Sequence, residues 1–179
     1  MKKSLSLLVF ACAALLAHAE VATLQLGAHG KLTLYFPDGW TATSTDMAGQ
    51  QTLTVSSTRD ANASCSLQIT APEEDRLDTK ARLKTRVEIE ATPIAQGSVE
   101  GKAVAREFTL SAGYGFFCNF TDPALRGKPS QKGNYKVMSV GKIRLAPDVM
   151  VDVQIMADGF RDSAYNELLG AIEGMEYKR

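Results

Sequence analysis

The chain has 179 residues, with 20 basic side chains, 20 acidic side chains and two histidines, so its formal net charge at neutral pH is zero. This balance argues against a general nucleic-acid or anionic-membrane binder, because both depend on a strongly positive surface. We therefore expect no nucleic-acid partner and no membrane insertion.

The first 19 residues have the three-part pattern of a secretory signal peptide: a basic start, an apolar run over 5–16 and a small-residue site ending at Ala19. The apolar run is shorter than the roughly 20 residues that span a bilayer. We expect cleavage after Ala19, one domain over 20–179 and a periplasmic location. Cleavage removes two lysines, which leaves 18 basic against 20 acidic side chains.

Cys12 raises the alternative of a lipidated N-terminus. Phe10 is bulky where a lipidation site has a small residue, and residues 13–19 continue the apolar run instead of opening a polar tether. We therefore favour cleavage after Ala19 over lipidation of Cys12.

Cys65 and Cys118 remain after cleavage, and an even pair in an exported chain favours a disulfide. Each is in phase with the large apolar residues of its predicted strand. A bridge between them would stabilise the fold by roughly 4 kcal/mol. The alternative is two buried free thiols.

In chain order, the first half of the sequence predicts short antiparallel strands with period-two alternation, at 21–26, 31–36, 40–44, 53–57 and 65–69. Pro37-Asp38-Gly39 predicts a sharp turn between the second and third strands. Trp40 stands directly behind this turn, and its phase predicts a core position. The polar segment Thr45–Gln51 predicts a loop.

The composition then changes to that of a charged helix over 73–91, capped by Asp75 or Asp78 and ended by Pro93. Its many basic residues indicate either a solvated face or contact with an acidic partner.

A hairpin between 94–99 and 102–111 follows, then strands at 116–120, 135–145 and 149–157 and an amphipathic helix at 162–175. The predicted class is α+β, with an antiparallel sheet of about six to eight strands packed against two helices.

This order, the turn motif at 36–40, the Glu100-Gly101 turn before the strand through Arg106 and the closing helix together resemble the Mog1/PsbP-like superfamily. The resemblance implies an αβα sandwich and a family whose members mostly act by binding other proteins. It brings no catalytic residues. The cysteine pair and the signal sequence depart from it and indicate an exported bacterial member.

Catalytic residues are scarce in the processed chain, where His29 would be the one remaining histidine. It lies beside a glycine, and we interpret it as a turn residue. The acidic group Glu73-Glu74-Asp75 is explained by the preference of a helix N-terminus for negative charge. No phosphate-binding or dinucleotide-binding glycine loop is present. We expect no enzyme, no metal and no cofactor.

The longest stretch without periodicity is 121–134, and loops of this length are commonly functional. Its basic residues Arg126, Lys128 and Lys132 form the candidate partner-binding site. The sequence thus favours a non-catalytic periplasmic module that binds another protein, either as an inhibitor or immunity-type protein or as an accessory of an envelope complex. The alternative is a small-ligand or lipid carrier with a cleft between sheet and helix.

Overall fold

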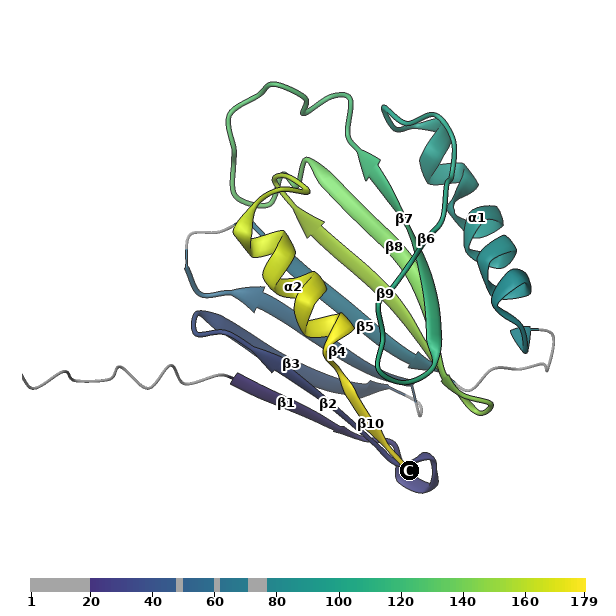
Figure 1. Ribbon diagram of the computed structural model, residues 1–179. Coiled ribbons are helices and arrows are strands. Elements are labelled where there is room, and N and C mark those ends of the chain that lie inside the picture. Colours follow the sequence, from purple (N-terminus) through teal and green to yellow (C-terminus); the bar gives the residue numbers. More distant parts are fainter. Residues whose placement is uncertain (1–19, 48–49, 60–61, 71–76) are drawn as a thin grey trace, which may run out of the picture.

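The computed structural model describes residues 20–47, 50–59, 62–70 and 77–179, which form two antiparallel sheets, two α-helices and a short 3₁₀ helix (Figure 1). The smaller sheet contains β1 (Glu20–Gln25), β2 (Lys31–Phe36) and β10 (Glu176–Lys178). The larger sheet contains β3 (Trp40–Met47), β4 (Gln50–Ser57), β5 (Ser64–Thr70), β6 (Arg106–Glu107), β7 (Tyr114–Thr121), β8 (Val137–Ala146) and β9 (Val149–Ala157). The helices are η1 (Gly27–His29), α1 (Lys80–Gln96) and α2 (Ser163–Glu173).

The strand order is β3-β4-β5-β9-β8-β7-β6 in the larger sheet and β1-β2-β10 in the smaller one. All paired strands are antiparallel. The predicted α+β class with a large antiparallel sheet is confirmed. None of the helices in the described part of the chain is long and apolar enough to cross a membrane.

The larger sheet has a separate apolar cluster on each face, because successive side chains of a strand point to opposite sides. On one face, Leu67 and Ile155 pack with Leu168 of α2 and with the smaller sheet. On the other face, Phe116 of β7 packs with Leu83 of α1. Figure 1 shows α1 beside β7 and α2 across the opposite side of the sheet.

The predicted turn at Pro37-Asp38-Gly39 carries the chain from one sheet to the other, since β2 and β3 belong to different sheets. Gly39 has a φ of 91°, a conformation that glycine adopts without steric cost. Trp40 is 2% exposed, which confirms its predicted core position. The short antiparallel strands predicted for the first half of the chain are therefore divided between two sheets at this corner.

The start of α1 differs from the prediction. The N-cap is Thr79, whose Oγ1 accepts a hydrogen bond from the backbone N–H of Arg82 at 3.3 Å. Asp78 pairs instead with the Arg82 side chain at 2.8 Å. The other proposed cap, Asp75, and the acidic group 73–75 lie outside the described residues.

The end of α1 also differs, because Pro93 lies inside the helix and the helix runs to Gln96. Proline removes the hydrogen bond to the carbonyl four residues earlier. That residue is Ile89, which is 62% exposed, so water can reach this side of the helix. Ala95 is buried against the sheet and keeps the last turn in register. The predicted strand at 94–99 is wrong.

Two further strand boundaries differ from the prediction. The predicted loop Thr45–Gln51 is largely strand, since β3 runs to Met47 and β4 begins at Gln50. The predicted strand at 102–111 is reduced to the two residues of β6.

Candidate functional site

The loop between β7 and β8 is built from successive tight turns. The backbone N–H of Leu125 donates to the Asp122 carbonyl at 3.3 Å, and that of Lys128 donates to the Leu125 carbonyl at 3.1 Å. Gly127 and Gly133 have φ values of 71° and 86°, which suit glycine in such turns. Figure 1 shows the loop extending beyond the end of the sheet.

Asn62 fixes the second half of this loop to the body of the protein. Its Nδ2 donates to the carbonyl of Asn134 at 3.0 Å and to Oδ1 of Asp158 at 3.0 Å. Its Oδ1 accepts from the backbone N–H of Gly133 at 3.0 Å. The loop is therefore held against the start of β5 and the end of β9, which gives its side chains defined positions.

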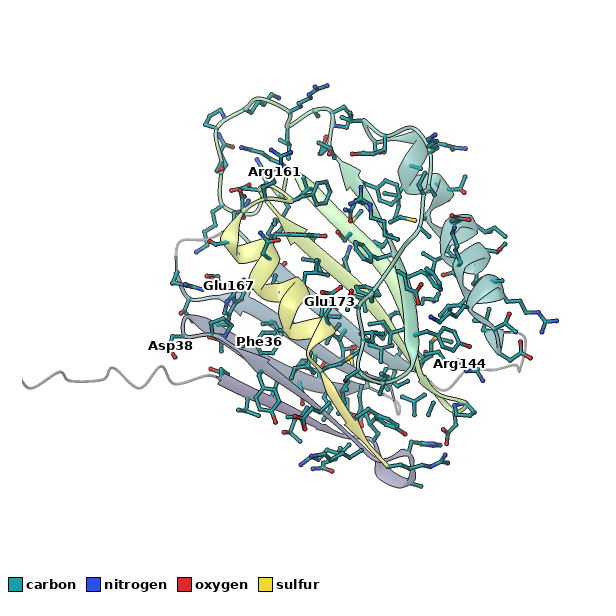
Figure 2. The ribbon with its side chains drawn as sticks, in the orientation of Figure 1. Phe36, Asp38, Arg144, Arg161, Glu167 and Glu173 are labelled. Carbon is teal, nitrogen blue, oxygen red and sulfur yellow. The ribbon has the colours of Figure 1, made fainter. Side chains whose placement is uncertain are left out.

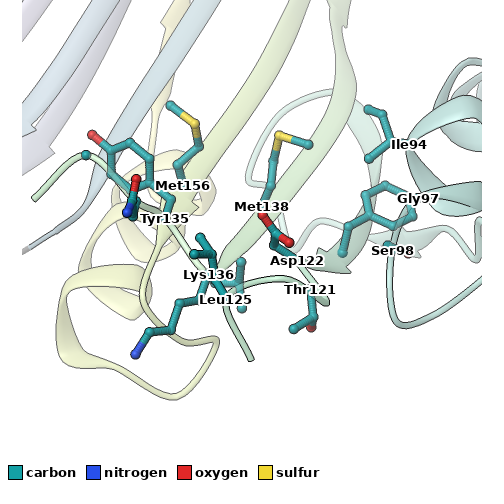
Figure 3. Close-up of a pocket in the computed structure, with 14 residues that line it drawn as sticks. Ile94, Gly97, Ser98, Thr121, Asp122, Leu125, Tyr135, Lys136, Met138 and Met156 are labelled. Atoms are coloured by element: carbon teal, nitrogen blue, oxygen red, sulfur yellow. The ribbon is translucent and has the colours of Figure 1, made fainter. Parts of the chain in front are cut away.

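A pocket of about 440 Å³ lies between this loop, the last turn of α1 and the adjoining ends of three strands (Figure 3). Its apolar lining comes from four separate segments and includes Ile94, Phe120, Leu125, Met138 and Met156. Because these residues are far apart in the sequence, only the folded chain brings them together. The pocket could accept an apolar group of a ligand or a partner.

Glu100 secures the rim of this pocket. Its carboxylate accepts hydrogen bonds from the backbone N–H and from Oγ1 of Thr121, both at 2.8 Å. Partial burial by itself would raise the pKa of Glu100, but the hydrogen bonds from Thr121 outweigh it and hold that pKa below its ordinary value. The carboxylate is thus occupied in fastening the segment after α1 to the end of β7.

The candidate residues Arg126, Lys128 and Lys132 all lie on the exposed part of the loop, which we call the basic crest. Within the described residues, no hydrogen bond or ion pair engages their side chains. The nearby carboxylate of Asp122 accepts from the backbone N–H of Ala124 at 2.7 Å. The crest therefore presents three cationic groups beside a partly apolar pocket.

The predicted disulfide is wrong, because both cysteines are free and buried. Cys65 lies in β5 and Cys118 in β7, with β9 and β8 between them. At about 4.8 Å per strand, their backbones are about 14 Å apart, whereas a disulfide requires Cα atoms within about 7 Å. They also face opposite clusters of the core.

Burial raises the pKa of the Cys65 thiol to about 12. Burial, reinforced by the charge of Glu88, raises that of Cys118 to about 11. Both thiols are therefore protonated at neutral pH, which makes them unreactive small hydrophobic groups. The alternative of two buried free thiols is the one that the structure supports.

His29 lies in η1, as expected for a turn residue, but it also contacts a carboxylate. Its Nδ1 is 2.8 Å from Oδ2 of Asp148, and Arg179 donates to the same oxygen at 3.0 Å. The hydrogen bond with His29 is the main cause that lowers the pKa of Asp148. Among the described residues, no cluster of three His, Cys, Asp or Glu side chains has a geometry suited to a metal ion.

The basic residues of α1 are mostly engaged within the chain. Lys80 pairs with Glu107 at 2.5 Å, Arg82 pairs with Asp78, and Arg86 pairs with Glu90 one turn away. This favours the interpretation of a solvated helix face. The basic crest, in contrast, keeps its charges available.

Sequence reasoning missed a polar contact at the corner between the two sheets. The indole Nε1 of Trp40 donates to Oε2 of Glu167 at 2.7 Å, and Arg59 donates to the same oxygen at 2.5 Å. Figure 2 shows Glu167 on α2, close to Phe36 and Asp38 at this corner. No sequence signal pairs Trp40 with a glutamate 127 positions away.

A partly buried lysine with two carboxylate partners was missed as well. Lys142 donates to Asp152 at 2.5 Å and lies 3.1 Å from Glu90 of α1. Burial would lower the pKa of Lys142, but the two carboxylates outweigh burial and raise it. This arrangement ties α1 to the interior strands β8 and β9.

No family model matches the chain, and no curated protein sequence matches it. Among solved structures, the fold is similar to that of the Ran-binding protein Mog1p of Saccharomyces cerevisiae, determined at 1.9 Å resolution. The match has 17% sequence identity and a TM-score of 0.48, and it covers 89% of this chain and 96% of the other. The resemblance to the Mog1/PsbP-like superfamily stays an expectation from the sequence, because a likeness at this level carries no further argument.

Proposed function

We propose that this chain is an exported, non-catalytic module that binds another protein through the pocket and the basic crest. The observation that carries the proposal is the position of three cationic side chains beside a pocket of about 440 Å³ whose lining is partly apolar. Within the described residues, these side chains have no hydrogen-bond or ion-pair partner. Such a site has the two parts of a protein interface, an apolar centre and a charged rim.

The chemistry of the site defines its partner. An apolar side chain inserted between Phe120, Met138 and Met156 would supply most of the binding energy, as buried anchors do in protein interfaces. Carboxylates flanking that anchor would meet the basic crest, which would mainly raise the association rate and set specificity. The expected partner segment is therefore an apolar residue bordered by acidic ones.

The proposed location is the periplasm, with a mature domain over 20–179 after cleavage at Ala19. The basic start and the apolar run of the first 19 residues support this assignment. Two roles fit a module of this kind: an inhibitor or immunity-type protein for a secreted toxin, and an accessory of an envelope complex.

Charge reversal on the crest tests the proposal. The variant R126E/K128E is compared with the matched control K31E/K84E, whose lysines are also exposed and lie away from the pocket. Both tagged variants and the unmodified chain are used to capture proteins from a periplasmic extract of the native host, with quantitative mass spectrometry. We expect a partner retained by the control and lost from the crest variant. Equal capture by both variants would refute the proposed surface.

The alternative is a small-ligand carrier, and the same pocket favours it because its volume lies within the usual range of ligand sites. Native mass spectrometry of the protein purified from its host separates the two functions. A bound small molecule or lipid of constant mass would favour the carrier, whereas a ligand-free chain would favour protein binding.

A further inference from the structure

Among the residues that the structure describes, Arg144 is a buried cation without a carboxylate partner. Its side chain is 6% exposed, its Nη2 donates to the carbonyl of Pro147 at 3.1 Å, and its Nη1 is buried with no hydrogen-bond partner. Two residues earlier on the same face of β8, Lys142 contacts two carboxylates. Buried charges are normally paired with an opposite charge. Among the described residues, the guanidinium of Arg144 has no such anion.

A pocket of about 520 Å³ adjoins this guanidinium, and its walls include Asp78, Tyr114, Arg144 and Pro147. The hydroxyl of Tyr114 donates to the carbonyl of Leu77 at 3.1 Å. This hydrogen bond holds the segment just before α1 against β7. Arg144 and Tyr114 are direct cross-strand partners. Figure 2 shows Arg144 at the end of its strand that lies away from the β7–β8 loop.

The N-terminus of α1 points to the same ligand chemistry. A helix of 17 residues carries a partial positive charge at its N-terminus, and α1 has no acidic residue in its first turn. Of the described residues in the wall of the pocket, Asp78 is the one with a carboxylate, and it already pairs with Arg82 at 2.8 Å. The pocket thus lies beside the residue that precedes the N-cap of α1, and among the described residues its guanidinium has no matching negative charge.

We propose that this pocket binds an oxyanion, a carboxylate or a phosphate group, with Arg144 as its anchor. A guanidinium presents parallel N–H groups that fit either group in a bidentate manner. The site lies at the opposite end of β7 and β8 from the basic crest, since Tyr114 pairs with Arg144 while Thr121 pairs with Val137. It is therefore a second site, independent of the proposed protein-binding surface.

The test is anion-dependent thermal stability of the purified chain. Unfolding is followed in increasing inorganic phosphate, and separately in increasing N-acetylglycine, each against sodium chloride at the same ionic strength. We expect the midpoint to rise with one or both anions in the unmodified chain. In R144M the apparent affinity falls about tenfold or more, because a charge-assisted pair is lost. A response to phosphate alone or to the carboxylate alone identifies the source of the oxyanion.

Control variants separate this site from other effects. R161M removes an exposed arginine and keeps the response, and R126E/K128E keeps it as well, so failure of the protein-binding proposal leaves this result intact. R144K retains the charge but not the parallel N–H groups of the guanidinium, so it should give an intermediate response. It replaces R144M in the test if R144M does not fold. Equal responses in R144M and the unmodified chain, or none in either, overturn the proposal.

Discussion

Replacing Glu167 by alanine removes the carboxylate that joins α2 to the corner between the two sheets. The indole N–H of Trp40 would lose its acceptor at 2.7 Å while remaining buried, which costs about 1–3 kcal/mol. The lost pair with Arg59 adds about 0–1 kcal/mol, because half of the Arg59 side chain is exposed. The expected destabilisation is about 2 kcal/mol, or a fall of about 4–8 °C in the midpoint for a domain of this size.

The assay is urea unfolding followed by circular dichroism in all variants, with Trp40 fluorescence as a second probe in those that keep this single tryptophan. R59M is the matched control, since it removes the exposed partner and leaves the indole acceptor in place; it should cost less than about 1 kcal/mol. In W40F the donor is absent, so adding E167A to it should cost clearly less than E167A alone. The reasoning is refuted if R59M destabilises as much as E167A, or if the two costs simply add in W40F/E167A.

Three further predictions concern the cysteines, the pocket rim and two glycines. Cys65 and Cys118 should not react with a thiol reagent in the folded state, and both should react after unfolding. The unfolding midpoint should be unchanged by reductant, and a lower midpoint in reductant would show that the two cysteines are bridged. The pKa of Glu100 is lowered, so its contribution to stability is present above the ordinary value of 4.5 and is lost as pH falls through the folded value. Unfolding of E100Q by urea should therefore show a weaker acid dependence than the unmodified chain, and an identical slope would contradict the assignment. G141A places a Cβ 2.4 Å from a backbone oxygen and should destabilise the fold by more than about 1 kcal/mol. G170A lies in open space on α2 and should stabilise the fold by up to about 1 kcal/mol. Thermal unfolding checks both, and equal midpoints for the two variants would contradict the crowding described at Gly141.

Local patterns predicted most of the strands because core-facing apolar residues recur at every second position along them. The run Val149–Ala157 is the clearest case, and the structure makes it the central strand β9. Patterns of this kind record which residues face a core. They do not record which sheet a strand joins, so the division between β2 and β3 could not be read from the sequence.

The errors in the helical region have a physical cause. Pro93 is a strong local signal for a helix end, but burial of Ala91 and Ala95 against the sheet outweighs one missing hydrogen bond near the exposed Ile89. Tertiary packing overrides local preference here. The three residues of β10 carry too little pattern to be predicted, and their strand forms only because β2 offers a free edge.

The candidate site was predicted in part. The length and composition of the β7–β8 loop singled out the basic crest, and the structure leaves those charges exposed. The pocket beside the crest was not foreseen, because its walls come from α1, β7, β8 and β9. Arg144 was also missed, since an arginine in an alternating strand gives no sign that its face is covered by a helix.

The central claim, that the basic crest and its pocket bind a protein, is tested most directly by site-specific photo-crosslinking in the native host. A photoreactive amino acid replaces the exposed Pro129 on the crest, and the same amino acid replaces the exposed Lys84 on α1 as the control. The account predicts a discrete crosslinked protein from position 129, absent from position 84 and lost when R126E/K132E is added. Identical products from both positions, or no product from position 129 while small molecules co-purify, would contradict it.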